Sequence, residues 1–369
     1  MVFLFLFCNN LFWKYKNKSI NMIERILVLG GKGGVGKSSI SAATAVALSD
    51  LLPNKKILLI SFDIAHNLTD MFNTEIGGKM TQLTNNNLWG IEPDPDAYAE
   101  QYTKVFAKKM KQLLKKMPIV GFIPQIKDFI DSTFTADSIP LALKNAMFFQ
   151  KILDAEDSIY REGDDQINFD IIVADFPPTG NMVALFDVPE DTVKVVLKYS
   201  LNFYNSIKGS IQGVSKMFKK MMHPLQPITN QESLSEELVK MLTELEERGE
   251  RISELIHNVG SLRLVTIAEK PSFEEIKRAR DLTQKYVNLE GVHINMLIPE
   301  EHAKTCDFCG KIQSLQQKYL KDIENEFQHT KIWETNKLIE EPIGLEGLRR
   351  LARAIYGNAS AHEILYPNS

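Results

Sequence analysis

The strongest chemical signal in the sequence is a glycine-rich segment that ends in a lysine and a serine. It reads GKGGVGKS over residues 31–38 and lies between an apolar run, Ile26–Leu29, and an alanine-rich helical stretch. Such glycines let successive backbone N–H groups turn toward phosphate oxygens at a helix N-terminus. Lys37 would neutralise the β- and γ-phosphates, and the Ser38 hydroxyl would ligate Mg²⁺. The predicted ATP-contacting residues of this phosphate loop are Gly31, Lys32, Gly33, Gly34, Val35, Gly36, Lys37, Ser38 and Ser39.

Two aspartates follow other apolar runs of the chain. Asp63 comes after Ile57–Ile60, and Asp175 comes after Asp170–Val173. In open α/β sheets, ligands bind beyond the carboxyl ends of parallel strands. An isolated aspartate at a strand end is more often a cap or turn residue, but beside a phosphate loop the functional interpretation is favoured. We therefore predict that Asp63 orients the attacking water and that Asp175 holds Mg²⁺.

The elements that must position these residues are short strands alternating with helix-length segments. The runs are rich in β-branched residues and apolar throughout, which is typical of a parallel sheet covered on both faces. The predicted fold is a doubly wound, mostly parallel α/β sheet with an inserted α-helical subdomain. The predicted strands are Ile26–Leu29, Ile57–Ile60, Asp170–Val173, Leu264–Ile267 and Val292–Ile298.

The domain boundaries follow from where such strands are missing. The nucleotide-binding domain is predicted to comprise residues 22–97, 161–189 and 259–369, and the helical subdomain residues 98–160 and 190–258. Residues 1–21 form an apolar N-terminal extension, interpreted as a mis-assigned start or as a disordered or weakly membrane-adsorbing tail.

Composition narrows the possible partners. The 369 residues contain 43 Lys plus Arg and 47 Asp plus Glu, so the formal net charge is -4. This near balance creates no whole-protein field for nucleic acid or an anionic membrane, and nucleic acid is not an expected partner. Three cysteines in a chain of this length fit a reducing, cytoplasmic compartment.

The predicted insert carries two apolar stripes at helical spacing, rich in methionine and flanked by lysines. Core packing explains most such stripes, but flexible methionines also suit the binding of variable apolar helices. We predict a client-binding groove, and the lysines beside it are suited to anionic lipid or to solubility. The groove residues are Phe106, Met110, Leu113, Met117, Ile211, Val214, Met217, Phe218 and Met221.

The nucleotide motifs together resemble the arsenical-pump-ATPase family of MinD-type NTPases, and within it the branch that targets tail-anchored membrane proteins. The loop resembles the family's deviant K-G-G-x-x-K-[ST] motif. Residues 63–70, DIAHNLTD, resemble D-P-A-H-N/S-L-S-D, and residues 175–181, DFPPTGN, resemble D-T-A-P-T-G-H. The resemblance spans roughly residues 24–357 and is sparse in the helical insert.

The resemblance implies a mechanism in which two chains cooperate. Lys32 would reach across a homodimer to the partner's nucleotide, so Asp63, Lys32 and Lys37 would be the catalytic residues. Asn295 would contact adenine. ATP would close the dimer, the paired inserts would shield a client's transmembrane helix, and hydrolysis with a membrane receptor would release it. The protein would then be cytoplasmic and transiently membrane-associated.

Cys306 and Cys309 form a Cys-x-x-Cys pair after the last predicted strand. Structural Zn²⁺ takes a tetrahedral ligand set, and one chain offers this pair plus Cys8 in the N-terminal extension. Two chains related by a twofold axis would supply four thiolates, and the family has the pair at this place, so we predict a Zn²⁺ shared across a homodimer. A redox dithiol and two unconnected thiols are the alternatives.

Several residues depart from the family motifs. Ile64 replaces proline, Phe176 and Pro177 replace threonine and alanine, and Asn181 replaces histidine. A proline-glycine-acid motif expected near residues 139–140 is absent. The residues expected to bind phosphate are retained despite these changes. The timing of conformational switching in the two aspartate segments, and its coupling to the insert, are expected to differ from the family.

Other functions share parts of this pattern. The soluble ATPase of an arsenite efflux pump typically joins two ATPase halves in one chain and carries a three-cysteine metalloid site. A DNA-partition or septum-positioning ATPase would share the Lys32 loop but lack the cysteine pair and the insert. A thiol-switched holdase would bind unfolded clients after oxidation of Cys306 and Cys309.

Overall fold

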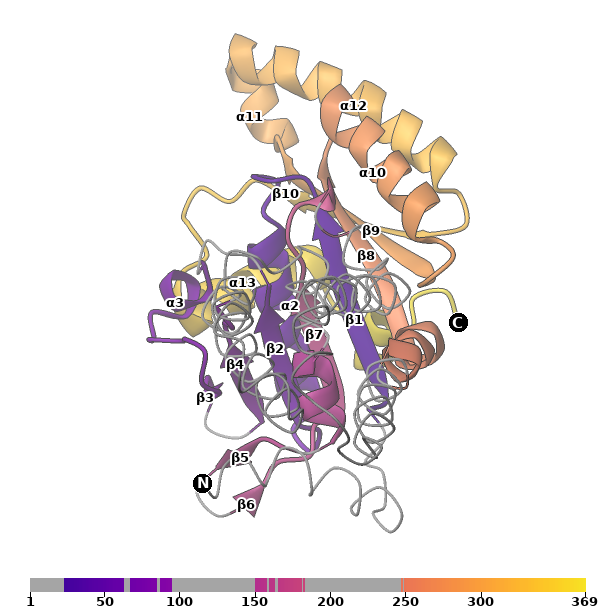
Figure 1. The fold of residues 1–369 in the computed structure, drawn as a ribbon. Helices are drawn as coiled ribbons and strands as arrows, with labels where there is room; N and C mark the ends of the chain where they lie inside the picture. Colours follow the sequence, from indigo (N-terminus) through magenta and orange to yellow (C-terminus); the bar gives the residue numbers. More distant parts are fainter. Residues whose placement is uncertain are drawn as a thin grey trace, which may run out of the picture.

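The protein is seen in a computed structural model that describes most of the α/β part of the sequence. The described residues are 23–62, 67–84, 87–94, 150–157, 159–162, 165–180, 182, 247 and 249–369. Within them, an eight-stranded sheet carries helices on both faces, as Figure 1 shows. The predicted α/β class is confirmed. Most of the predicted helical subdomain lies outside the described residues and stays a prediction.

The strand order of the large sheet is β10-β9-β8-β1-β7-β2-β4-β3. All neighbouring pairs are parallel except β3 with β4. The predicted runs correspond to β1, β2, β7, β8 and β9. The bounds are β1 (Arg25–Gly31), β2 (Ile57–Ser61), β3 (Thr81–Gln82), β4 (Leu88–Ile91), β7 (Ile171–Asp175), β8 (Gly260–Ile267), β9 (Leu289–Leu297) and β10 (Lys331–Asn336), with a separate antiparallel pair β5 (Arg161–Glu162) and β6 (Asp165–Gln166).

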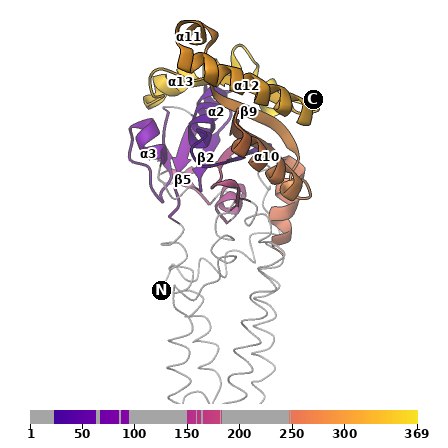
Figure 2. The same ribbon diagram turned by 90° about the horizontal axis from the view of Figure 1, so that it is seen from above.

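Helices cover the sheet on two sides because its central strands are apolar throughout. Ile26 and Val28 of β1 pack with α10 and α12, whereas Leu27 and Leu29 pack with α2 and α13 on the other face. α10 and α12 lie side by side (Figures 1 and 2). The helix bounds are α2 (Lys37–Leu51), α3 (Asn67–Phe72), α10 (Lys270–Thr283), α11 (Glu300–Thr305), α12 (Asp307–Glu326), α13 (Gly344–Tyr356) and α14 (Ala361–Leu365).

Two short helical stretches border the segments that the structure does not describe. Residues 150–156 and 249–259 are helical, and Ile152 and Ile256 are buried in the same core cluster as α10. Arg251 joins the two stretches, because its guanidinium lies 2.8 Å from carboxylate oxygens of both Glu156 and Asp157. The ends of the predicted insert are thus held against each other on the sheet.

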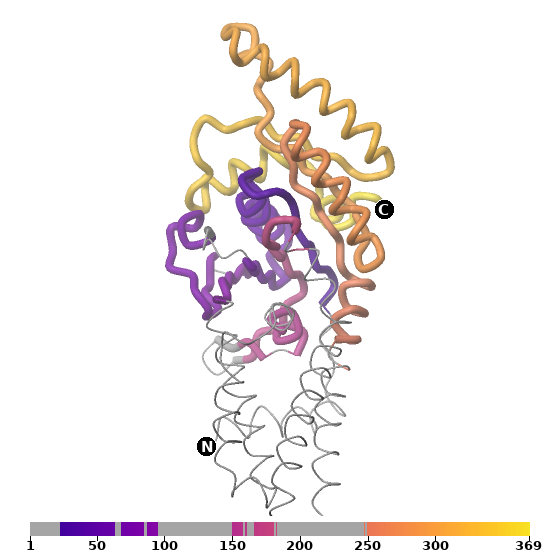
Figure 3. Tube along the Cα trace, turned by 45° about the horizontal axis from the view of Figure 1, so that its top comes forward, coloured from indigo at the N-terminus to yellow at the C-terminus, as the bar shows by residue number. Residues whose placement is uncertain are grey.

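The strand β4, which lies next to the edge strand β3, and the edge strand β10 at the other side of the sheet were not predicted from the sequence. β10 alternates buried and exposed residues, with only Trp333 and Thr335 buried. β4 has four residues, too few to show a period. Both strands are recognised only by their pairing with β2 and β9. Figure 3 follows the chain from β9 into α11 and α12 and then back to the sheet through β10.

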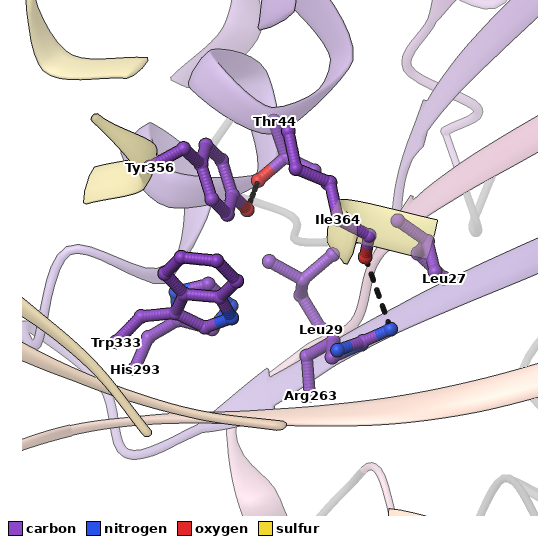
Figure 4. A pocket seen from close by; sticks show the side chains of 8 residues that line it. All are labelled: Leu27, Leu29, Thr44, Arg263, His293, Trp333, Tyr356 and Ile364. Carbon is purple, nitrogen blue, oxygen red and sulfur yellow. Dashed lines mark hydrogen bonds between the residues drawn. The ribbon is translucent and has the colours of Figure 1, made fainter. Parts of the chain in front are cut away.

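A buried polar cluster lies between the sheet and the helices α2 and α13 (Figure 4). The hydroxyls of Thr44 and Tyr356 are 2.6 Å apart, and Arg263 donates to the carbonyl of Ile364 at 3.2 Å. His293 is 1% exposed and stacks edge-on against Tyr356. The space between these side chains is too narrow for a water molecule. Burial lowers the pKa of His293 to about 3, and the charge of Arg263 acts in the same direction.

The stability of the fold should therefore fall in acid because of His293. The folded-state pKa is about 3, below the ordinary value of 6.5, so between these values the unfolded chain binds more protons. Stability is fully present above about pH 6.5 and decreases as the pH falls, with a slope of up to about 1.4 kcal/mol per pH unit from this group. Urea unfolding of wild type and His293→Leu across this range measures the difference. Equal pH slopes in the two proteins would contradict the prediction.

Candidate nucleotide-binding site

The phosphate loop lies where the sequence predicts it, between β1 and α2. β1 ends at Gly31 and α2 begins at Lys37. Gly36 is the N-cap residue of α2, no side chain caps this helix start, and its first turn contains no acidic residue. A helix start of this kind presents N–H groups and positive partial charge to an anion.

The loop requires glycine at its end for two reasons. Gly36 has a φ of 85°, in the left-handed region. A Cβ atom there would also lie 2.3 Å from the side-chain amide nitrogen of Asn295, at the end of β9. That nitrogen donates a hydrogen bond to the carbonyl of Val35 at 3.0 Å. The loop and the end of β9 are therefore in direct contact, which places Asn295 beside the phosphate loop. A contact between Asn295 and adenine stays a prediction.

Lys37 and Asp175 meet at the carboxyl end of the sheet. The Lys37 Nζ lies 3.1 Å from an Asp175 carboxylate oxygen, and the side chains are 5% and 0% exposed. The hydroxyls of Ser41 and Ser61 lie 3.3 and 3.4 Å from the two oxygens of Asp175. Asp175 is thus held as a buried carboxylate by the lysine of the loop, by α2 and by β2.

These side chains fit the ligands of an ATP-bound Mg²⁺ ion. Ser38 is buried one residue beyond Lys37, and Asp175 offers a buried carboxylate beside the same helix start. Hydroxyl and carboxylate oxygens are the donors that Mg²⁺ prefers. The sequence reasoning did not identify Ser41 and Ser61. Ser61 could have been found from strand pairing, because it stands opposite Asp175 in the register of β2 and β7.

The second predicted carboxylate, Asp63, lies outside the described residues, but the segments on both sides of it are placed. Phe62 continues β2, and α3 begins at Asn67. Glu92, directly after β4, is 1% exposed and holds the first turn of α3. One oxygen accepts a hydrogen bond from the Leu68 N–H at 2.8 Å, and the other accepts one from the Thr69 hydroxyl at 3.1 Å. Glu92 therefore holds the start of α3, the helix that follows Asp63 in the chain.

Replacing Glu92 with alanine should destabilise the protein by about 1–3 kcal/mol, because the buried N–H of Leu68 would lose its acceptor. Urea unfolding at neutral pH measures the change. Glu75→Ala is the matched control, since Glu75 is an exposed carboxylate shortly after α3. An unchanged unfolding midpoint for Glu92→Ala, or an equal loss in Glu75→Ala, would remove the proposed role of Glu92.

The cysteine pair lies at the start of α12. Cys306 is the N-cap residue, and its sulfur accepts a hydrogen bond from the Cys309 N–H at 3.4 Å. This bond lowers the pKa of Cys306, while the contact with Cys306 raises the pKa of Cys309. Cys306 is exposed and Cys309 partly exposed. In the described part of the chain, no group of three or more metal-ligating side chains is found.

α12 connects the cysteine pair to the nucleotide site. Gln316 accepts a hydrogen bond from the Ile298 N–H at 2.9 Å and donates one to the Met296 carbonyl at 3.1 Å. Met296 has a φ of 60°, which is unusual for a residue other than glycine, and follows Asn295 directly. The backbone at the end of β9 is thus clamped between α12 and the phosphate loop.

Of the remaining predicted residues, the structure describes those of the phosphate loop and not those of the groove. Lys32 is partly exposed and Gly33 exposed in the loop. The predicted client-groove residues all lie outside the described residues: Phe106, Met110, Leu113, Met117, Ile211, Val214, Met217, Phe218 and Met221. The helices that the structure describes include none that is both long and apolar enough to span a bilayer.

A family model and several known proteins match most of this chain. The family model described as "Anion-transporting ATPase" matches residues 24–357. "Putative arsenical pump-driving ATPase 1" of Aquifex aeolicus (strain VF5) is 30% identical over 359 residues, covering 93% of this chain and 81% of that protein. "Putative arsenical pump-driving ATPase 2" of the same organism is 29% identical over 330 residues, covering 89% and 98%. "ATPase get3" of Aspergillus terreus (strain NIH 2624 / FGSC A1156) is 27% identical over 352 residues, covering 93% and 92%.

The family model covers most of the chain and includes every described element from β1 to α13. The strand–loop–helix arrangement of the phosphate loop is that of a P-loop NTPase. The relatives are named as ATPases of two kinds, arsenical pump-driving ATPases and get3. This chain belongs to the anion-transporting ATPase family and is a P-loop ATPase.

Proposed function

We propose that this ATPase works as a homodimer that captures the transmembrane helix of tail-anchored membrane proteins and delivers it to a receptor at a membrane. The observation that carries the proposal is the exposed Cys306–Cys309 pair at the start of α12. Two thiols are half of a tetrahedral zinc site, which a second copy of the chain would complete. Similarity to get3 over 93% of the chain also supports this function.

The proposed hydrolysis uses the phosphate loop together with the two aspartates. Lys37 would leave its contact with Asp175 and neutralise the β- and γ-phosphates, while the loop N–H groups bind their oxygens. Ser38 and Asp175 would hold Mg²⁺, which when bound supplies positive charge to the phosphate oxygens. Asp63 would orient the attacking water. Lys32 of one chain would reach the nucleotide of the partner and stabilise developing charge there.

The nucleotide state would reach the rest of the molecule through described contacts. Glu92 links α3 to the end of β4, and the chain then enters the segment 95–149, where the predicted insert begins. Gln316 links the end of β9 to the cysteine-bearing helix α12. Changes at the phosphates would therefore be transmitted to the groove residues and to the dimer contact. The protein would be cytoplasmic, reaching the membrane only to release its client.

A second function is favoured by the names of two relatives. The Aquifex proteins at 30% and 29% identity are named as arsenical pump-driving ATPases. An arsenite-pump ATPase would need a thiol site for the metalloid, and the sequence contains three cysteines, two of them in the 306–309 pair. A thiol-switched holdase is a third candidate that is compatible with targeting. The zinc content measured before and after oxidation distinguishes the holdase from the targeting ATPase.

Co-purification with a client tests the proposed function. The full chain is expressed with a tagged protein that has one C-terminal transmembrane helix, and recovery of a soluble complex is measured. We expect a complex with wild type and at least a tenfold loss with the double variant Leu113→Asp/Met217→Asp. Leu282→Asp, on α10 and 52% exposed, places one such charge outside the predicted groove and should leave recovery unchanged.

The same preparation also tests the alternative function as an arsenite-pump ATPase. Absence of any complex, together with ATP hydrolysis that rises on addition of arsenite, would replace the targeting proposal with the arsenite-pump function. An equal loss of complex in the Leu282→Asp control would also overturn the groove assignment, because it would show general sensitivity to surface charge.

A further inference from the structure

Two buried aromatic rings are in contact at the ends of β2 and β7, next to the two predicted carboxylates. Phe62 directly follows β2 and precedes Asp63, whereas Phe176 directly follows Asp175 at the end of β7. The rings are 1% and 0% exposed. Their centroids are 5.2 Å apart and their planes are inclined by 66°, an edge-to-face contact. The sequence reasoning treated Phe176 only as a departure from a motif and did not consider Phe62.

The backbone of both residues continues the sheet beyond the assigned strands. The Phe62 N–H donates to the Asp175 carbonyl at 2.8 Å, and the Phe176 N–H donates to the Leu29 carbonyl at 3.0 Å. The Ser61 hydroxyl adds a contact of 3.4 Å to the Asp175 carboxylate. The ends of β1, β7 and β2 are thus joined into one block, with the two rings on the α10 side of the sheet.

The chain beyond Phe176 then turns back onto the phosphate loop. Met182 donates its backbone N–H to the Pro178 carbonyl at 3.1 Å, closing one helical turn. A Cβ atom on Gly30 of β1 would lie 2.1 Å from the Met182 sulfur, so this side chain packs directly on the strand that leads into the loop. A Cβ atom on Gly33 would lie 3.9 Å from the Pro178 ring. The aromatic contact is therefore at the base of a segment that touches the loop.

We propose that the Phe62–Phe176 pair is a positioning element that holds the ends of β2 and β7 together, so that Asp175 and the residue that leads into the Asp63 segment keep a fixed place beside the phosphate loop. The inference rests on the roles proposed above for the two aspartates. Both rings are buried in the core cluster, so they act through the backbone of the strand ends. The rate of hydrolysis should depend on the pair more than ATP affinity does, because reacting groups must be aligned closely whereas binding uses the loop itself.

A second aromatic pair provides a matched control. Trp89 and Phe169 are 3% and 0% exposed, belong to the same core cluster, and make an edge-to-face contact at 5.6 Å and 78°. They lie near the amino ends of β4 and β7, at the edge of the sheet opposite Asp175. Loss of this pair weakens the same core without altering the strand ends that carry the carboxylates.

The test compares Phe62→Leu, Phe176→Leu, the double variant and Phe169→Leu in the full-length protein without client. The measurements are kcat and KM for ATP, the Kd of a fluorescent ATP analogue, and the thermal midpoint. We expect kcat to fall at least tenfold in each strand-end variant while the Kd changes less than about threefold. The double variant should have the kcat of the slower single variant, because either single substitution already removes the contact between the two rings. Phe169→Leu should lower the thermal midpoint and keep kcat within twofold.

Three results would overturn the proposal: unchanged kcat in the strand-end variants, an equal fall of kcat in Phe169→Leu, or independent effects that multiply in the double variant. If a leucine variant does not fold, Phe62→Met and Phe176→Met retain more of the side-chain volume and serve the same comparison. The readout is intrinsic hydrolysis, so failure of client capture would leave it intact. A fully active Asp63→Asn variant would refute the role of Asp63 separately.

Discussion

Replacing Lys37 with alanine should lower ATP turnover by about 10²–10³-fold and weaken ATP binding as well. The lysine is the buried cation of the phosphate loop, with its Nζ 3.1 Å from Asp175. Removing a preorganised positive group from a site shielded from water costs a large part of the charge stabilisation of phosphoryl transfer. Steady-state hydrolysis gives the turnover. The thermal shift on adding ATP reports the affinity, because a ligand that binds only the folded state stabilises it by RT ln(1 + L/Kd), where L is the free ligand concentration.

The control for this experiment is Lys304→Ala. Lys304 is 71% exposed and pairs with Glu300 on α11, so its loss removes the same charge from the surface. We expect turnover close to wild type for Lys304→Ala. Lys37→Ala also removes the cation beside the buried Asp175, whose other contacts include the hydroxyls of Ser41 and Ser61, and the thermal midpoint without ATP measures any loss of stability. Normal turnover in Lys37→Ala would show that the loop lysine has no part in the chemistry.

Asp63→Asn should keep ATP binding and abolish turnover, with a loss of at least about 10²-fold. An amide has nearly the same shape as the carboxylate but cannot accept a proton or orient water with a negative charge. The phosphate loop, Lys37 and Asp175 are untouched by this change, so the Kd of a fluorescent ATP analogue should stay within about threefold of wild type. Near-normal turnover would remove Asp63 from the mechanism.

Mixing variants tests whether two chains share the reaction. Lys32→Ala and Asp63→Asn should each be inactive alone. In a mixed dimer, the Lys32→Ala chain keeps its own Asp63 and receives Lys32 from its partner, so one of the two sites regains activity. Recovery of turnover on mixing is expected if Lys32 acts across the dimer. No recovery, in mixtures shown to contain mixed dimers, would assign Lys32 to its own chain or to no catalytic role.

Some elements of this fold could be predicted from the sequence, and others could not. The loop from Gly31 to Ser38 and the strands β1, β2 and β7 were predictable because they depend on local features: glycine spacing, continuous apolar runs and helix periodicity. β10 was not predictable, because an edge strand buries only alternate residues and half of its side chains remain polar. Pairing with β9, not composition, creates this strand.

What the sequence alone determined about this protein is its chemistry: a phosphate loop, carboxylates after parallel strands, and a pair of thiols. Tertiary structure decided which of these residues meet. Asp175 reaches Lys37 and Ser61 because β7 lies between β1 and β2, although more than a hundred residues separate β2 from β7 in the chain. The contacts of Asn295 with the loop and of Phe62 with Phe176 have the same origin. Strand order depends on how whole faces of the sheet are buried, and no local pattern records it.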